Sequence, residues 1–205
     1  MGVEVHTHTE VLAFERSGAR ISRVVTTRGD FTPEEVVLTA GSWSGVLARE
    51  LGLRLPIQGG KGYSITFKRP LEAPSLPIVC GEAKIGVTPM IDALRFAGTL
   101  ELAGLDLTIS RQRVAAVLSG VPLYLPDLKP EEMELVEIWR GLRPCTPDGL
   151  PFLGRARHID NLTVAAGHAM IGVSLGPITG KLVAEVVSGE KPSIDLDLLK
   201  VDRYA

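Results

Sequence analysis

Residues 162–180 read LTVAAGHAMIGVSLGPITG, and this stretch directs the interpretation of the rest of the chain. Leu162–Ala166 predicts a buried strand, Gly167 opens a glycine-rich loop, and Ile178–Ser188 predicts a helix ended by Gly189. Three glycines recur every four residues, which places them on one face of a helix: Gly172, Gly176 and Gly180. That bare face suits either close packing against another helix or contact with a flat ring.

A second strand–glycine–helix segment lies near the start of the chain. Glu35–Ala40 predicts a strand buried on both faces, Gly41 ends it, and Trp43–Leu51 predicts a helix with Ser42 as its N-cap. Glycine allows a ligand to approach the backbone, and a helix N-terminus offers free N–H groups to an anion. The alternative is an ordinary strand-to-helix turn.

The third segment is Gly141–Pro151, which contains one arginine, Arg143, directly before Pro144. Thr146-Pro147-Asp148-Gly149 has the residues of a type I turn. Arg143 is either a hydrogen-bond donor that stabilises the fold or a fork for a carboxylate, since a guanidinium gives two parallel N–H bonds. His168, a lone histidine beside a glycine, favours a structural role over a catalytic one.

The composition limits the classes of function. The chain has 205 residues, a formal charge of −2 and 45% hydrophobic residues, which indicates a core-forming protein and argues against disorder and against general binding to nucleic acid. Two distant cysteines and four scattered histidines give no disulfide framework and no metal-ligand spacing. The glycines and proline of residues 162–180 argue against a transmembrane segment, and Met1 is not followed by a secretory leader.

The remaining pattern predicts an α+β fold. Short strands are expected at Val3–His6, Glu10–Glu15 and Ile21–Thr27, and a helix capped by Ser110 is expected to run to Leu118. Further strands are predicted in the middle of the chain, at Tyr63–Lys68, residues 77–90, residues 94–103 and Glu134–Trp139.

Taken in order, these segments resemble the C-terminal part of the FAD-dependent D-amino-acid oxidase superfamily. The likeness covers residues 3–204 and is carried by Val37–Ser44, Lys61–Ser64, Arg95–Glu101, Gly141–Gly154 and Gly167–Gly180. Within the superfamily the chain is most similar to D-amino-acid dehydrogenases. That resemblance implies oxidation of the C–N bond of a D-amino acid to an imino acid, by hydride transfer to FAD. The alternatives are an oxygen-using amino-acid or amine oxidase of the glycine oxidase type, or an inactive binding fragment.

The resemblance also implies site residues. Arg143 would bind the substrate carboxylate, and Tyr63 is a second substrate-pocket candidate. A larger set would line the path of a non-covalent FAD: Val11, Ala40, Gly41, Trp43, Gly172, Val173, Ser174, Gly176 and Thr179. No residue is assigned as catalytic.

Three positions depart from relatives within the superfamily. Gly141 stands where sarcosine oxidases carry the cysteine that tethers the flavin, so a covalent flavin is not expected. Ser174 and Met170 stand where sarcosine oxidase has its substrate-binding lysine and glycine oxidase its second arginine. The substrate preferences of those two enzymes are therefore not transferred to this chain.

The implied domain plan has three segments. Residues 1–52 would be part of a Rossmann-like FAD-binding domain, residues 53–140 a substrate-binding domain built on a mixed β-sheet with helices, and residues 141–205 a return segment that completes the FAD-binding domain. No G-x-G-x-x-G is present. We therefore expect an N-terminally truncated, inactive enzyme. Expected partners are an amino-acid substrate and a second copy of the chain. The expected location is cytoplasmic, with peripheral association to the inner membrane as the alternative.

Overall fold

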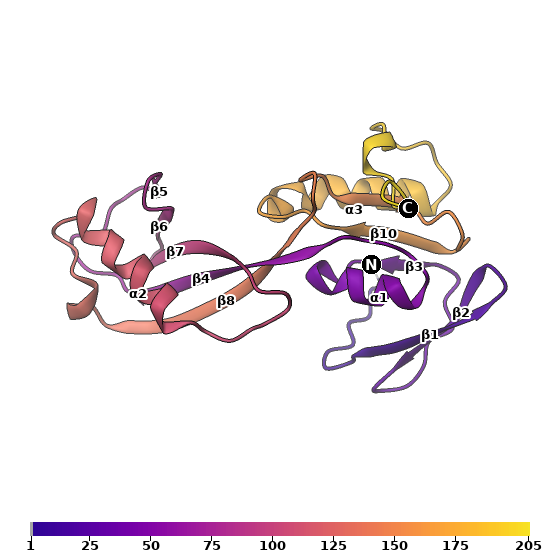
Figure 1. Ribbon diagram of the computed structural model, residues 1–205, viewed down its shortest axis with the longest axis horizontal. Helices are drawn as coiled ribbons and strands as arrows, with labels where there is room; N and C mark the ends of the chain where they lie inside the picture. The colour runs from indigo at the N-terminus through magenta and orange to yellow at the C-terminus, as the bar shows by residue number, and fades with distance from the viewer. Residues whose placement is uncertain (1) are drawn as a thin grey trace. The chain divides into compact units, whose positions relative to one another are not determined.

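The computed structural model describes residues 2–205 and divides the chain into two compact units (Figure 1). The first unit contains both ends of the chain, namely the residues up to Gln58 together with Pro144–Ala205. The second unit is the intervening segment Gly59–Arg143. We predicted boundaries after residues 52 and 140, a few residues before the divisions at Gln58 and Arg143. The assignment of a function to each segment stays a prediction.

A three-stranded sheet forms the centre of the first unit. Its order is β3 (Val36–Leu38), β10 (Leu162–Ala166) and β9 (Phe152–Arg155), with β10 parallel to β3 and antiparallel to β9. All five residues of β10 are buried, as expected for an apolar strand covered on both faces. The sequence did not predict β9, which follows directly after the proline-containing turn.

A β-hairpin precedes this sheet. It pairs β1 (Val11–Ser17) with β2 (Arg20–Thr26) in antiparallel fashion. The fully buried Asn161 joins the hairpin to β10, because its amide donates to the carbonyl of Ile21 at 3.0 Å and accepts from the Ile21 N–H at 2.8 Å. Val3–His6 was predicted as a strand and is not one, because no strand pairs with it and Val3 remains 81% exposed.

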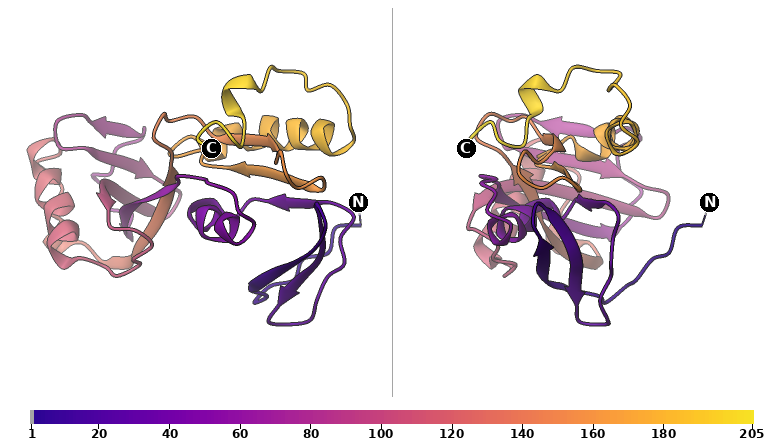
Figure 2. Two further views of the ribbon diagram at one scale, coloured as in Figure 1. Left: turned by 45° about the vertical axis from the view of Figure 1, so that its right-hand side comes forward. Right: turned by 90° about the vertical axis from the view of Figure 1, so that its right-hand side faces the viewer.

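The helices of the first unit begin at different residues from those predicted. A 3₁₀ turn, η1 (Gly41–Trp43), precedes α1 (Ser44–Glu50), so Ser42 lies inside the turn and Trp43 takes the N-cap position without a side-chain hydrogen bond. Helix α3 (Gly172–Val187) begins six residues before Ile178, and Pro177 lies inside it. Figure 2 shows α3 alongside β9 and β10, and Leu182 of the helix packs against Leu153 and Ala165 of these strands. This packing extends the helix through the glycine-rich segment, because it outweighs the weak helix propensity of glycine.

The chain after α3 closes against the start of β9. It forms a short 3₁₀ turn, η4 (Asp197–Leu199), and then reaches Arg203, which donates to both carboxylate oxygens of Asp148 at 2.9 and 3.1 Å. The Arg203 guanidinium also lies 3.8 Å from the ring centroid of Phe152. Both interactions fix the turn that we predicted at Thr146–Gly149.

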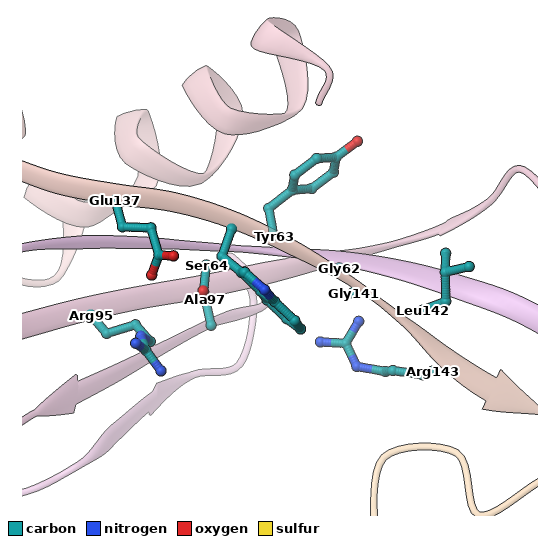
Figure 3. A pocket seen from close by; sticks show the side chains of 10 residues that line it. Gly62, Tyr63, Ser64, Arg95, Ala97, Glu137, Gly141, Leu142 and Arg143 are labelled. Carbon is teal, nitrogen blue, oxygen red and sulfur yellow. The ribbon is translucent and has the colours of Figure 1, made fainter. Parts of the chain in front are cut away.

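A five-stranded sheet forms the second unit. Its order is β5 (Ile78–Cys80), β6 (Ile85–Pro89), β7 (Ala93–Leu102), β4 (Gln58–Lys68) and β8 (Leu135–Cys145). The pairings of β5 with β6, β6 with β7 and β7 with β4 are antiparallel, and in Figure 3 β4 and β8 run in opposite directions. The mixed sheet that we predicted here is therefore wrong for these described strands. Hairpin-length connections join β5, β6 and β7, and such connections give antiparallel pairing. Parallel pairing occurs in the first unit instead, between β3 and β10.

Helix α2 (Arg111–Gly120) covers one face of this sheet. Its N-cap is Ser110, as predicted, and the Ser110 side chain accepts from the Arg113 N–H at 3.3 Å. Alternate residues of β4 and β7, such as Ile65, Phe67 and Phe96, pack with Val117 of the helix in one core. Two 3₁₀ turns, η2 (Val121–Leu123) and η3 (Pro130–Glu132), follow. The opposite face of the sheet carries the residues described next.

Within residues 2–205, no helix has both the length and the apolar composition that crossing a bilayer requires.

Candidate functional site

A cavity of about 550 Å³ lies on the face of the five-stranded sheet that points away from α2 (Figure 3). It is bordered by Gly62, Tyr63, Ser64, Arg95, Ala97, Glu137, Trp139, Gly141, Leu142 and Arg143. Most of these residues alternate along β4, β7 and β8, and alternate residues of a strand share one face. The cavity is therefore formed by one face of the sheet and not by loops.

Arg143 lies at one end of this cavity, in β8, a few residues before the turn predicted at Thr146–Gly149. Its guanidinium lies directly over Gly62, where a Cβ atom would be 2.0 Å from Nη1. Nη1 also donates to the carbonyl of Thr99 at 3.2 Å. One bond to the backbone holds the guanidinium in place, and the remaining N–H groups are available for a ligand carboxylate.

Thr99 occupies an irregular position in β7. Lys61 pairs with Glu101 and Tyr63 pairs with Gly98, so two residues of β7 oppose the single residue Gly62 of β4. This bulge holds Thr99 at φ 72°, in the left-handed region that β-branched residues rarely adopt. The strained backbone places the Thr99 carbonyl where Arg143 binds it, and such strain is found at functional sites.

Trp139 forms the wall next to Arg143. A Cβ atom at Gly141 would lie 2.2 Å from the Trp139 ring, so this glycine lets the indole fold over the strand. The indole remains 51% exposed, which is high for a tryptophan in a sheet. Gly141 stands where sarcosine oxidases carry the flavin-linked cysteine, and in this chain its role is steric.

Arg95 lies toward the other end of the cavity. Its Nε donates to Oγ1 of Thr66 at 3.0 Å, and among the described residues its terminal nitrogens have no protein acceptor. Glu137 lines the same cavity. We did not single out either residue, nor Trp139, as a site residue. A strand extended from Glu134 to Arg143 would have revealed Glu137 and Trp139, since Glu137, Trp139, Gly141 and Arg143 then share one face.

Tyr63 contributes differently from the expectation. Its side chain is 1% exposed and lies on the α2 side of the sheet, where its hydroxyl donates to Oε2 of Glu101 at 2.8 Å. The same hydroxyl accepts from the Ser110 N–H at 3.4 Å. Only the backbone of Tyr63 therefore remains to border the cavity, and a substrate contact through its phenol has no support in this geometry.

A charged network around the buried Lys61 lies behind the Thr99 bulge, on the α2 side of the sheet. The Lys61 side chain is 1% exposed, and its Nζ lies 2.6 Å from Oδ2 of Asp106 and 3.8 Å from Oε2 of Glu101. Hydrogen bonds from Lys61 and Thr108 hold the pKa of Asp106 far below its usual range, and the bond to Asp106 raises the pKa of Lys61. Both groups are charged at neutral pH, and they anchor the residues on either side of the bulge.

A second cavity, of about 420 Å³, lies in the first unit. It is lined by Val37, Thr39, Gly41, Pro144, Ala165, Ala166, Gly167, His168, Ala169, Gly172, Gly176, Thr179, Gly180 and Val183. These residues come from the ends of β3 and β10 and from one face of α3. The structure thus brings together two of the glycine-containing segments that directed the sequence interpretation.

The residues predicted to contact the cofactor divide into two groups. Gly41, Gly172, Gly176 and Thr179 line the cavity of the first unit. The others do not line it: Val11, Ala40, Trp43, Val173 and Ser174. Val173 points to solvent, with 95% of its surface exposed. Contacts from this second group remain predictions.

His168 lies in the wall of the same cavity. Its Nε2 is 3.0 Å from Oγ1 of Thr179. Burial lowers the pKa of His168, so the imidazole is neutral at pH 7. A neutral ring held by a threonine matches the structural role that the sequence favoured.

The cavity of the first unit fits a flat, electron-poor ring. A Cβ atom added at Gly41, Gly176 or Gly180 would meet nothing within 4 Å, so the backbone there is open to a bound group. The N-terminus of α3, a 16-residue helix, adds free N–H groups and the positive end of a dipole. These features suit the pyrimidine edge of a flavin, which gains negative charge on reduction.

The five-stranded sheet thus carries a cavity with two arginines, and the first unit carries a glycine-lined cavity. The sequence profile described as "FAD dependent oxidoreductase", the DAO family, matches residues 1–186. The chain belongs to this family of FAD-dependent oxidoreductases.

Two curated relatives and one solved structure are similar to this chain over nearly its whole length. The chain is 34% identical over 210 residues to the D-amino acid dehydrogenase of Vibrio atlanticus, covering 100% of this chain and 49% of that protein. It is 34% identical over 194 residues to the glycine oxidase of Pseudomonas aeruginosa, covering 94% and 52%. The crystal structure of glycine oxidase from Geobacillus kaustophilus matches with a TM-score of 0.88 at 30% identity, covering 98% and 53%. The chain therefore spans about half the length of the curated relatives that it matches.

Proposed function

We propose that this chain supplies the substrate-binding sheet and part of the FAD site of a D-amino-acid dehydrogenase. The observation that carries the proposal is Arg143, whose guanidinium is fixed over Gly62 by the Thr99 carbonyl and faces a cavity large enough for an amino acid. The identity to D-amino acid dehydrogenases supports the same reaction.

In this reaction an amino acid loses two electrons and becomes an imino acid, which water then hydrolyses to a 2-oxo acid and ammonia. Bound FAD supplies the electron acceptor. Arg143 holds the substrate carboxylate by a charge-assisted fork, and Trp139 excludes water from one side of the cavity. The open glycine face and the N-terminus of α3 would hold the flavin without a covalent bond.

The experiment is dye-linked oxidation of D-amino acids by a full-length enzyme that contains this chain, supplied with FAD. Replacing Arg143 by Ala removes the partner of a carboxylate, which typically costs about 3 kcal/mol, so we expect KM to rise about 100-fold while bound flavin is unchanged. Arg140→Ala is the matched control, because Arg140 is in the same strand and donates to the carbonyl of Leu107. An unchanged KM in the Arg143 variant contradicts the proposal.

A second candidate is an oxidase that passes electrons directly to oxygen. The likeness to glycine oxidases in sequence and in fold favours it. Hydrogen peroxide formed in step with substrate oxidation identifies the oxidase, whereas oxidation that requires an added dye or quinone identifies the dehydrogenase. A chain that binds amino acids but oxidises none is the third candidate, the binding fragment.

A further inference from the structure

The two arginines of the sheet cavity, Arg95 of β7 and Arg143 of β8, are each held next to a different residue of β4. The Arg143 guanidinium lies over Gly62, and the Arg95 Nε is bound to the side chain of Thr66. Gly62 and Thr66 are four residues apart in β4 and on the same face. At the rise of an antiparallel strand, Gly62 and Thr66 are about 13 Å apart, and we take this spacing of the two anchor points as the separation of the guanidinium groups.

This separation limits the length of a ligand that touches both groups. A carboxylate bound side-on to a guanidinium places the two central carbons about 4 Å apart. After that allowance at each end, about 5 Å remain between the two acceptor carbons of the ligand. An extended five-carbon chain has this distance between its first and its last carbon.

The surface between the two arginines suits the middle of such a chain. Ser64 of β4 pairs with Ala97 of β7, and both small side chains lie on the floor of the cavity midway between Gly62 and Thr66. The half-exposed Trp139 ring provides an apolar wall. Methylene groups are accommodated there, and a branched or aromatic substituent has less room.

We propose that the cavity selects straight five-carbon α-amino acids whose side chain ends in a carbonyl group, the class of glutamate and glutamine. Arg143 binds the α-carboxylate and Arg95 donates to the terminal carbonyl oxygen. The proposal rests on the proposed function, because it takes Arg143 as the carboxylate ligand. It adds Arg95 as the residue that determines side-chain specificity.

Glu137 distinguishes the two members of this class. Its carboxylate lines the same cavity and forms no ion pair with another described residue. A second carboxylate is repelled by Glu137, whereas an amide donates to it while accepting from Arg95. We expect glutamine to bind more tightly than glutamate, and Glu137→Gln to reverse that order.

The test is a series of ¹H–¹⁵N NMR titrations of the intact chain, following the arginine Nε–Hε signals. D-Glutamine, D-glutamate and D-norvaline have the same carbon chain, and D-norvaline lacks the terminal carbonyl. D-Asparagine is one carbon shorter and D-2-aminoadipate one carbon longer. We expect D-glutamine to bind at least fivefold more tightly than D-norvaline, D-asparagine and D-2-aminoadipate, and only D-glutamine and D-glutamate to shift the Arg95 signal.

Two variants separate the inference from the proposed function. Arg95→Met should remove the preference for D-glutamine over D-norvaline while D-norvaline binding stays, and Arg143→Met should abolish binding of every ligand. Equal affinity for D-glutamine and D-norvaline in the native chain overturns the inference and leaves the carboxylate site intact. Binding that survives Arg143→Met overturns the proposed function as well. The ligand series needs no substitution, so a variant that fails to fold does not affect it.

Discussion

At the scale of single residues, two glycines shape the substrate cavity by what they leave out. Gly62 gives room to the Arg143 guanidinium and Gly141 gives room to the Trp139 ring. Neither has the positive φ that would require glycine for its backbone conformation. Their role is therefore steric, and an added methyl group would displace a ligand-binding side chain rather than strain the main chain.

Gly62→Ala tests this role. The new methyl group would overlap the end of a flexible side chain, so we expect a change in unfolding free energy below about 1 kcal/mol. The displaced guanidinium should weaken D-amino-acid binding about tenfold, measured by the NMR titration described above. Gly86→Ala is the control, since Gly86 lies on the same face of the sheet and a Cβ there approaches the Ala97 carbonyl only to 3.8 Å. Full affinity in the Gly62 variant would contradict a steric role.

The sequence located some of these residues and missed others for a clear reason. Arg143 stood out because an arginine directly before a proline, among apolar residues, needs a partner. Arg95 and Trp139 did not stand out, because their position on the cavity face depends on where β7 and β8 begin and end. Tyr63 appeared in a suggestive segment, but strand alternation turns its side chain to the opposite face.

At the scale of elements, the bulge in β7 is the feature on which the site depends. Lys61, Glu101 and Asp106 form a charged network that borders the bulge, and Thr99 at its centre supplies the carbonyl for Arg143. Elements of this kind have no simple sequence signal, because a bulge is defined by the register of two strands. Pairing Lys61 with Glu101 and Tyr63 with Gly98 fixes that register.

The network makes stability depend on pH. The folded protein lowers the pKa of Asp106, so this carboxylate stabilises the fold above its unfolded pKa of about 3.9 and that contribution is lost as the pH falls further. We expect urea unfolding to show a loss of stability between pH 5 and pH 3, and Asp106→Asn to be less stable at pH 7 with a flatter acid limb. Asp127→Asn, a substitution outside this network, should retain the acid limb of the native chain. The same limb in both variants would contradict the assignment.

At the scale of the whole molecule, the chain covers about half of its curated relatives and contains no G-x-G-x-x-G. Glycines line the cavity of the first unit, and the described residues include no glycine-rich phosphate cradle of that type. Dimerisation of the chain and a cytoplasmic location remain predictions, and light scattering tests the first of them.

FAD binding by the 205-residue chain tests whether the chain holds the flavin ring but not the ADP part of the cofactor. We expect FAD and riboflavin to bind with similar, weak affinity, because riboflavin carries the same ring and lacks the ADP part for which the chain has no fingerprint. Titration by flavin fluorescence measures both affinities under the same conditions. A preparation that stays yellow after desalting, or FAD binding more than tenfold tighter than riboflavin, would contradict the expectation.

The sequence by itself determined the family resemblance, the apolar strands and the Ser110 cap, and it singled out Arg143 as a candidate, because each depends on neighbouring residues. Only the tertiary structure decided that α3 runs through Gly172–Pro177, that the five-stranded sheet is antiparallel, and that Arg95, Trp139 and Arg143 share one face. The physical reason is that strand register and helix packing are set by residues distant in sequence. The glycines of residues 162–180 illustrate both: the sequence showed their spacing, and packing against β9 and β10 made them a helix face.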